Sequence, residues 1–170
     1  MKDDLSRDVA LLGDDDAVRH VLAEVCALTG MGFSAVAHVT QDRWIACQVD
    51  DRIDFGLDPG AELEVRKTIC DEIRQSGKAI IIDDTDADRD WWNHPVPLLY
   101  GFHSYVSLPI TLEDGSFFGT LCAIDPEPRT GRIADHLGEL EALARQVARI
   151  LQARIDQEPG IALGLPQPIR

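Results

Sequence analysis

The stretch that decides the fold is SYVSLPITLEDGSFFGTLCAID, residues 104–125. Residues 104–112 alternate and are rich in residue types that favour strands. Glu113-Asp114-Gly115-Ser116 supplies a turn in which Gly115 is free to take a positive φ, and residues 117–124 return as a second apolar run. Pro126 ends that run because proline has no N–H to give to a sheet ladder. The stretch predicts a β-hairpin, and we expect the functional site beside it.

The part of the chain before the hairpin predicts two helices and three strands. Residues 1–12 are weakly patterned, and we expect a frayed helical lead-in that Gly13 ends. One of Asp14, Asp15 and Asp16 can cap the first helix. Strands are predicted at 33–40, 43–49 and 78–83, and a second helix at 63–75. Apolar positions with helical spacing give the first helix one buried face: Val18, Val21, Leu22, Val25 and Leu28.

The part after the hairpin predicts the longest helix, at 131–157, followed by a loosely packed tail at 158–170. A short helical segment is expected around 96–100, just before the hairpin. Consecutive hairpins make the sheet antiparallel, and the two terminal helices must then cover one of its faces. The sequence therefore predicts a three-layer α+β domain at residues 14–157, because the apolar run 79–82 also requires a layer on the other face.

Composition excludes several classes of protein. The net charge of −14 argues against a nucleic-acid surface, which needs clustered cations. No apolar run approaches the roughly 18 residues of a membrane span, and the acidic start does not resemble a signal peptide, so we expect a cytoplasmic protein. The cysteines, Cys26, Cys47, Cys70 and Cys122, form no CxxC pair and predict reduced, mostly buried thiols.

This order of elements resembles the GAF domain family. Residues 101–110, GFHSYVSLPI, and 118–125, FGTLCAID, placed before a long amphipathic helix, are the most specific part of a similarity that covers about residues 14–155. The chain is similar to sensory GAF modules of bacterial histidine kinases and diguanylate cyclases. The resemblance implies a six-stranded antiparallel sheet, a small-ligand pocket on one face, and terminal helices on the other face that usually dimerise.

The family is functionally broad, and three of its branches can be compared with these residues. Cyclic-nucleotide-binding members carry an Asn-Lys pair that this chain lacks. Bilin-binding members use a histidine after a Ser-Pro-Ile-type turn, whereas this chain has His94-Pro95-Val96-Pro97 and no Cys-His dipeptide. Free methionine sulfoxide reductases use thiolates near the pocket. Here Asp71 and Glu72 beside Cys70 would raise its pKa and oppose thiolate formation.

The best polar constellation is the face shared by His103, Tyr105 and Ser107, which lie two residues apart along one strand. It suits an uncharged or hydrogen-bonding small molecule. The acidic loop 83–90 has aspartates at alternate positions, as an EF-hand does, but the pattern fails at Arg89 and, after the loop, at Pro95. Two interpretations of the loop therefore stay open: a solvated acidic loop, or a weak site for a divalent cation. The residues predicted to bind the ligand are Trp91, Trp92, Tyr100, His103, Tyr105, Ser107, Cys70 and Asp83.

We therefore expect a sensory or regulatory module, with no catalytic residue and no metal, whose ligand and cofactor the sequence leaves unknown. A parallel homodimer is expected through residues 14–29 and 131–157, because Leu143 and Ile150 widen the apolar stripe of the last helix, as Val21 and Leu28 do in the first. The chain is either a stand-alone protein or a sensor domain with an output partner. The alternatives are a thiol-dependent small-molecule reductase, a bilin photosensor, or a ligand-free dimerisation module.

Overall fold

The predicted hairpin is the centre of the structure, a computed structural model that describes residues 3–63, 70–85, 101–129, 132–158, 160–161 and 163. Strands β5 (Ser104–Thr111) and β6 (Phe117–Asp125) pair antiparallel along their length. The turn between them is closed by the N–H of Leu112, which donates to the carbonyl oxygen of Ser116 at 2.9 Å. Gly115 has φ of 85°, the positive value that the sequence predicts for the turn glycine.

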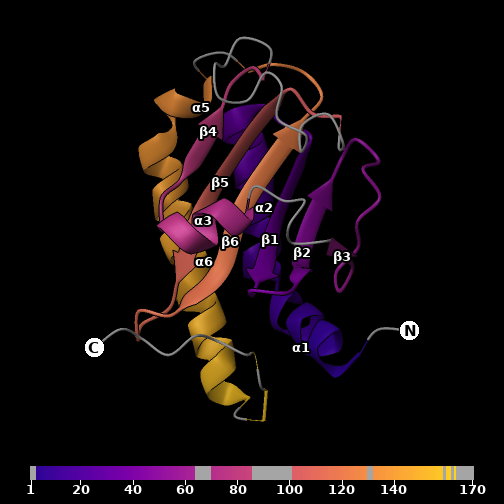
Figure 1. The fold of residues 1–170 in the computed structure, drawn as a ribbon, viewed down its shortest axis with the longest axis vertical. Helices are drawn as coiled ribbons and strands as arrows, with labels where there is room; N and C mark the ends of the chain where they lie inside the picture. Colours follow the sequence, from indigo (N-terminus) through magenta and orange to yellow (C-terminus); the bar gives the residue numbers. More distant parts are fainter. Residues whose placement is uncertain are drawn as a thin grey trace.

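The other described elements follow in chain order, and Figure 1 labels them along the ribbon. Helix α2 begins at its cap Asp15, whose carboxylate accepts from the N–H of Ala17 at 2.8 Å, and ends at Gly30, which has left-handed geometry with φ of 74°. The remaining bounds are α1 (Asp4–Gly13), α2 (Asp16–Thr29), β1 (Phe33–Val39), β2 (Trp44–Asp51), β3 (Glu62–Leu63), α3 (Cys70–Ser76), β4 (Ile80–Ile82), α5 (Arg132–Asp135) and α6 (Leu137–Gln157).

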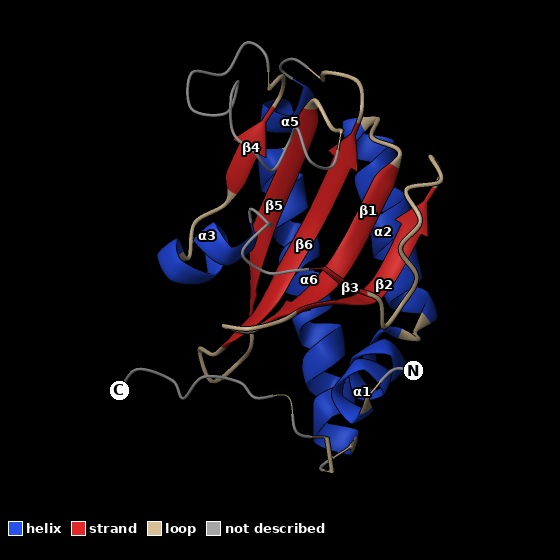
Figure 2. Ribbon diagram, turned by 45° about the vertical axis from the view of Figure 1, so that its right-hand side comes forward, coloured by secondary structure: helices blue, strands red, loops and turns tan. Residues whose placement is uncertain are grey.

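The six strands form one antiparallel sheet in the order β3-β2-β1-β6-β5-β4. This is the α+β layering predicted from the sequence, with the six strands that the resemblance to the GAF family implies. In Figure 2 the strands β5, β6, β1 and β2 run side by side, with β6 and β1 in the middle, and Figure 1 shows the short strands β4 and β3 at the two edges. The middle of the sheet therefore joins the first hairpin of the chain to the last one.

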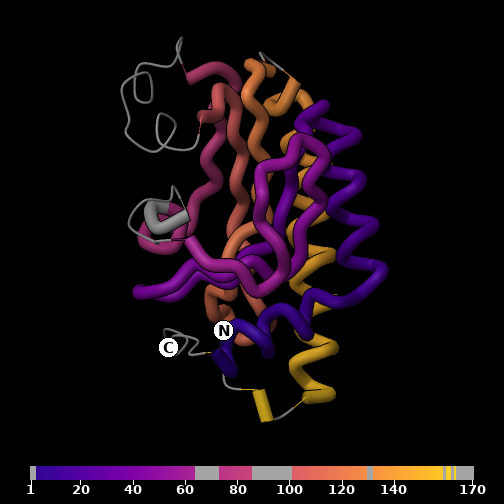
Figure 3. Tube along the Cα trace, turned by 90° about the vertical axis from the view of Figure 1, so that its right-hand side faces the viewer, coloured from indigo at the N-terminus to yellow at the C-terminus, as the bar shows by residue number. Residues whose placement is uncertain are grey.

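Helices α2 and α6 cover one face of the sheet, and α1 packs on β2 at its lower end (Figure 3). Every second residue of the strands points into this helix layer, as Val36, Val106, Leu108 and Leu121 do. From the helices, Val18, Leu22, Leu140 and other apolar side chains complete this core cluster. The terminal helices thus bury the apolar stripes that the sequence predicts for them.

The opposite face of the sheet carries a second core cluster, and α3 lies on this side (Figure 3). Its members alternate with the first set along the same strands: Phe33, Ala35, Ala37 and Val39 on β1, Tyr105 on β5, and Cys122 and Ile124 on β6. The isoleucines of β4 divide between the faces, with Ile82 in this cluster and Ile81 packed on the other. The prediction that this strand needs a layer on both sides is confirmed.

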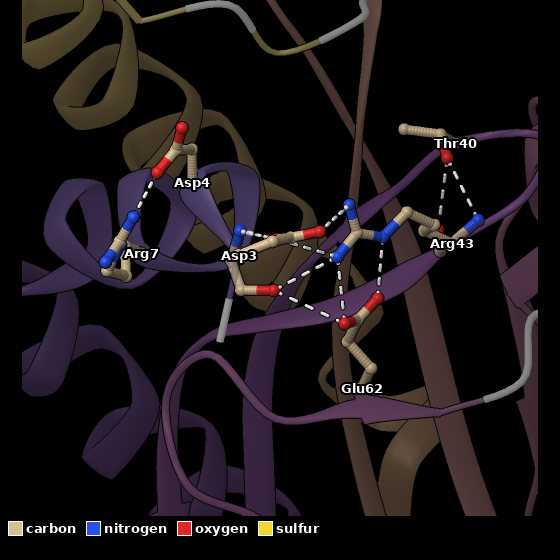
Figure 4. Close-up of polar contacts among 7 residues, drawn as sticks. Asp3, Asp4, Arg7, Thr40, Arg43 and Glu62 are labelled. Carbon is tan, nitrogen blue, oxygen red and sulfur yellow. Dashed lines mark hydrogen bonds and ion pairs between the residues drawn. The ribbon is translucent and has the colours of Figure 1, made fainter. Parts of the chain in front are cut away.

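Arg43 ties the N-terminal helix to the edge of the sheet that carries β3 (Figure 4). Its guanidinium donates to both carboxylate oxygens of Glu62, at 2.7 and 2.8 Å, and to the carboxylate of Asp3 at 3.0 Å. Asp3 is also the N-cap of α1, where it accepts from the N–H of Ser6 at 2.9 Å. One cation therefore fixes α1 and β3 to β2 together.

Three local predictions differ from the structure. The helix predicted at 63–75 is described as α3 over Cys70–Ser76, and residues 64–69 lie outside the described part of the chain. Leu63 differs from the prediction, because it is in β3, where it pairs with Trp44. The helix predicted at 131–157 is divided at His136, whose N–H bonds the carbonyl of Ile133 in a tight turn. The frayed lead-in is the packed helix α1. The expected segment at 96–100 lies outside the described residues.

The tail is also less loose than predicted where it is described, because the side chain of Leu163 is buried in the core cluster on the helix side of the sheet. None of the described helices is long and apolar enough to cross a membrane. The boundaries 14–157 for the domain remain a prediction.

Candidate functional site

A pocket of about 510 Å³ opens on the sheet face opposite the terminal helices. Three segments far apart in sequence form most of its wall: the loop after β2, the residues just before β5, and the end of β6. The lining residues are Ile53, Asp54, Phe55, Leu57, Leu63, Gly101, Phe102, Ile124, Asp125 and Pro126. A mainly apolar wall with a few polar groups is typical of a small-molecule site.

The loop wall of the pocket is organised by the carboxylate of Asp51, at the end of β2. It accepts from the N–H groups of Ile53, Phe55 and Gly56 at 3.2, 3.0 and 2.9 Å. Burial alone would raise the pKa of this carboxyl, but the backbone hydrogen bonds outweigh burial and lower the pKa. The loop is therefore held in one shape that presents Asp54 at φ of 58°, a backbone conformation that aspartate tolerates but seldom adopts.

Two aromatic pairs flank the pocket. The ring of Phe55 lies 5.0 Å from that of Phe33 on β1, at an interplanar angle of 42°. The ring of Phe102 stacks on that of Tyr105, with centroids 5.3 Å apart and an angle of 27°. Because Phe33 and Tyr105 belong to the sheet, they fix the position of the two rings, Phe55 and Phe102, that line the cavity.

The end of β6 supplies a buried polar group of the pocket wall, Asp125, which is 4% exposed. Its oxygens accept from the N–H groups of Gly32 and Glu127, both at 2.8 Å, and pair with the guanidinium of Arg129 at 3.2 Å. These bonds join the start of β1 to the segment after β6. Asp125 is therefore primarily a structural clamp at one side of the pocket.

Two of the predicted ligand residues, Tyr105 and Ser107, lie on the pocket side of the sheet. They pair directly with Ile124 and Cys122 of β6, and residues that pair directly across an antiparallel ladder share a face. Both side chains are buried, and Tyr105 reaches the cavity through its stack on Phe102. Both residues therefore belong to the part of the sheet that faces the pocket side.

His103 precedes β5, and its ring is directed to the end of the neighbouring strand. Its Nδ1–H donates to the carbonyl oxygen of Pro126 at 2.8 Å, and its backbone N–H donates to the carbonyl of Asp125 at 3.0 Å. The predicted convergence of His103, Tyr105 and Ser107 on one ligand remains a prediction. In the structure the ring of His103 contacts Pro126, a residue of the pocket wall.

The other predicted residues fall at the limits of the described chain. Trp91, Trp92 and Tyr100 lie outside the described residues, as does most of the acidic loop. Cys70 begins α3, but its side chain is not described, and Asp83 follows β4, where its carbonyl accepts from the N–H of Arg129 at 2.7 Å. Their role in ligand binding remains a prediction.

Sequence reasoning missed the loop wall of the pocket. The sequence identifies residues 50–60 only as a loop, yet they supply Asp54, Phe55 and Leu57. An aromatic residue followed by Gly56, with φ of 98°, is a usable signal, since a large apolar side chain in a glycine-containing loop needs a surface to pack on.

Cys26, Cys47 and Cys122 are buried, and two of them have raised pKa values that oppose redox chemistry. Burial raises the pKa of the Cys47 thiol to about 12, and its S–H donates to the carbonyl of Val9 at 3.2 Å. Burial also raises the pKa of Cys26. Cys122 lies on the pocket side, opposite Ser107. Within the described residues no group of three metal-ligating side chains gathers.

Comparison with protein families matches the GAF domain model to residues 15–151 of this chain. Among curated protein sequences, none matches significantly. The family match spans the whole sheet, the pocket wall and most of α6.

Comparison with solved structures finds the same fold at low sequence identity. The GAF domain of a two-component sensor histidine kinase from Bacillus halodurans superposes with a TM-score of 0.64 at 15% identity, covering 87% of this chain and 98% of that one. The GAF-B domain of DevS from Mycobacterium smegmatis gives 0.60 at 18% identity, covering 86% and 98%.

An enzyme is also among the similar structures. Free methionine-R-sulfoxide reductase from Neisseria meningitidis, solved in complex with its substrate, gives a TM-score of 0.55 at 16% identity, covering 88% of this chain and 89% of that one. At these identities the structural similarity concerns the fold alone, so function has to be argued from the residues of this chain.

Proposed function

Since this chain belongs to the GAF domain family, we propose that it is a sensory or regulatory module that binds a small molecule and signals through its terminal helices. The observation that carries the proposal is the division of β5 and β6 between a pocket side and a helix side. Tyr105 and its partner Ile124 belong to the pocket side, and Val106 and its partner Ala123 to the helix side.

This alternation gives a physical route from ligand to output. Ile124 lines the pocket, and the neighbouring Ala123 belongs to the same core cluster as Leu140 and Val147 of α6. Interiors are close-packed, so a shift of the strand on one side cannot be absorbed without repacking on the other. A ligand that displaces the wall at Phe102 or Ile124 would therefore bias the packing of α6.

The proposal is tested on two samples of the chain: the chain as purified, and the chain after it has been unfolded and refolded free of bound molecules. Native mass spectrometry and hydrogen exchange are measured on both. We expect an additional bound mass, and slower exchange in residues 137–157 while it is bound. The variant Leu57→Trp should fill the pocket and remove the bound mass, while the matched control Asp58→Trp, on the exposed side of the same loop, should retain it. A chain with no bound mass and unchanged exchange would instead support the ligand-free dimerisation module.

A second candidate function is a thiol-dependent reductase, because an enzyme of this kind from Neisseria meningitidis has a similar fold. The raised pKa values of Cys26 and Cys47 oppose it, because the thiolate is the reactive species. We expect Cys26, Cys47 and Cys122 to react with a disulfide reagent only on unfolding. One rapidly reacting thiol that is lost in Cys70→Ser would favour the enzyme.

The bilin photosensor is separated from both by an absorption spectrum. A linear tetrapyrrole gives a visible band, and we expect none from the chain purified after expression in a cell that makes bilins. A visible band that follows the protein through denaturation would reverse this expectation and show a covalently attached pigment.

A further inference from the structure

The chemistry of the pocket wall also specifies a class of ligand, an inference that rests on the proposed ligand-binding function. Most of the lining side chains are apolar, and two of those are the aromatic rings of Phe55 and Phe102. Each ring is fixed by a second ring behind it, on Phe33 and Tyr105. A pair of fixed rings favours a planar apolar body, or a cation that lies against their faces.

The charged groups at the pocket are carboxylates from two different segments, Asp54 from the loop and Asp125 from the end of β6. The cations nearest in sequence are already committed: the guanidinium of Arg129 pairs with Asp125 at 3.2 Å, and that of Arg52 pairs with Asp50 at 3.1 Å. No side chain in the described part of the chain lends the cavity wall a positive charge.

Asp54 differs from Asp125 in that its carboxylate has no hydrogen bond or ion pair with the described residues. It is exposed and lines the pocket, and the carboxylate of Asp51 fixes the loop that presents it. The whole chain carries −14, so the long-range field also favours a positive ligand. An anion at this site would meet the carboxylate of Asp54, and none of the lining side chains among the described residues carries a hydrogen-bond donor to offset it.

We infer that the pocket takes an organic cation, a small apolar or aromatic body that carries an ammonium group, with the body between Phe55 and Phe102 and the cation beside Asp54. The volume of about 510 Å³ is in the range of small-molecule sites. The apolar wall supplies affinity, and the carboxylate supplies selection by charge. This class is narrower than the uncharged or hydrogen-bonding molecule that the sequence suggests.

The test uses three probes with the same phenyl body and different heads: 2-phenylethylammonium, 2-phenylethanol and 3-phenylpropionate. Each is titrated into the isotopically labelled full chain, and amide chemical shifts are followed at Phe55, Gly56, Gly101 and Phe102. We expect the cation to bind more tightly than the alcohol, and the alcohol more tightly than the carboxylate. The preference for the cation should weaken as salt is added, because the interaction is at the exposed rim.

Asp54→Asn is the decisive variant, because asparagine also tolerates a positive φ and so preserves the loop. It should weaken the binding of 2-phenylethylammonium about two- to fivefold, the scale of an exposed ion pair, and leave 2-phenylethanol unchanged. Asp58→Asn removes the same charge from an exposed position of the same loop that does not line the pocket. It should change the binding of the cation less than Asp54→Asn does.

The possible results distinguish this inference from the proposed function. If the alcohol or the carboxylate binds as tightly as the cation, the ligand class is wrong while the pocket remains a binding site. If Asp54→Asn weakens the cation and the alcohol equally, the carboxylate does not select by charge, and the inference is also overturned. If no probe shifts the four resonances, both the ligand class and the assignment of this pocket as the ligand site fail.

Discussion

Gly119, in the middle of the sheet, leaves no room for a side chain. A Cβ at this position would overlap the carbonyl oxygen of Ala37 on β1, and the contact is with backbone rather than with a movable side-chain end. Gly119 pairs with His38 across the same ladder. The residue is therefore required by the close approach of β1 and β6, which builds the centre of the sheet.

We predict that Gly119→Ala destabilises the fold by about 3 kcal/mol, because the two central strands must separate to admit the methyl group. The matched control is Gly138→Ala in α6, where a Cβ meets no atom within 4 Å. That change should be neutral or stabilising by up to about 1 kcal/mol, since alanine favours the helix. Urea unfolding monitored by circular dichroism measures both, and equal effects at the two positions would contradict the clash.

Glu62 provides a second prediction at the residue scale, one that depends on pH. Hydrogen bonds from Arg43 lower the pKa of its carboxyl in the folded chain. A lowered folded pKa means that the stabilisation is fully present above the unfolded value, about 4.3, and is lost as pH falls through the folded value. The side chain of Glu62 is 41% exposed, so screening limits the contribution.

We therefore expect Glu62→Gln to cost about 0.5 kcal/mol at pH 7. The difference from the wild type should be constant between about pH 5 and 7 and shrink below about pH 4.3. Urea midpoints across this pH range measure the difference, with Glu24→Gln on the exposed face of α2 as the control. A cost for Glu62→Gln that persists unchanged at about pH 3 would show that Arg43 is not its source.

At the scale of the element, α1 is the clearest case of a helix whose importance comes from its packing. It is only ten residues long, and short helices have little stability alone. In the structure Val9 and Leu12 are buried in the core beside β2, and a Cβ at the helix end, Gly13, would overlap the backbone of Cys47. The helix is thus fitted closely to the sheet.

Leu12→Ala should consequently cost about 3 kcal/mol in the free energy of unfolding, through the lost transfer energy and the cavity. The neighbouring Leu11 is 50% exposed, and Leu11→Ala should change stability by less than about 0.5 kcal/mol. Both are measured by urea unfolding of the full chain. If α1 were a frayed lead-in, the two variants would be equally mild.

The pocket loop shows the same dependence on context at this scale. Its conformation follows from hydrogen bonds that Asp51 accepts from three later residues, and its aromatic residue, Phe55, is positioned by Phe33 on another strand. A local pattern identifies such a segment as a loop. Only its contacts make it a wall of the pocket.

At the scale of the whole molecule, the proposed homodimer requires α2 and α6 to contact the same helices of a second copy of the chain. Val21, which the sequence suggests for a dimer contact, is buried within its own chain, and Leu28, Leu143 and Ile150 are partly buried against the same core. Among the described residues, the exposed large apolar side chains are Leu11 and Ile53, neither of which is on α2 or α6. A homodimer through these helices remains a proposal that depends on the partly buried residues.

If the proposed dimer forms, light scattering should give twice the 18.8 kDa mass of the chain at micromolar concentration. Leu143→Arg should shift the population to monomer, because it places a charge in the proposed interface. Glu141→Arg introduces the same side chain two residues earlier, on a different side of α6, and should leave the dimer intact. A monomeric wild type, or equal loss in both variants, would exclude this interface.

The sequence by itself determined most of the strands and helices, but not the edge strand β3. The central hairpin, the terminal helices and the α+β layering all followed from periodicity and turn chemistry, which are local properties. The sequence also limited the cap of α2 to three aspartates, of which the structure uses Asp15. The prediction that Tyr105 lies on the pocket side depended on the alternation of successive side chains between the two faces of a strand, which β5 follows. These features need no knowledge of which residues meet at long range.

Only the tertiary structure decided the composition of the pocket wall. Asp54 and Phe55 join Phe102 and Asp125 there although they are far apart in the sequence, because β2 and β6 are both neighbours of β1 in the sheet. The same holds for Leu63, which pairs with Trp44 of β2 although it was assigned to a helix, and for α1, whose packing on β2 its own sequence does not specify. In each case the deciding free energy comes from contacts between distant segments, and local propensity is too weak to oppose them.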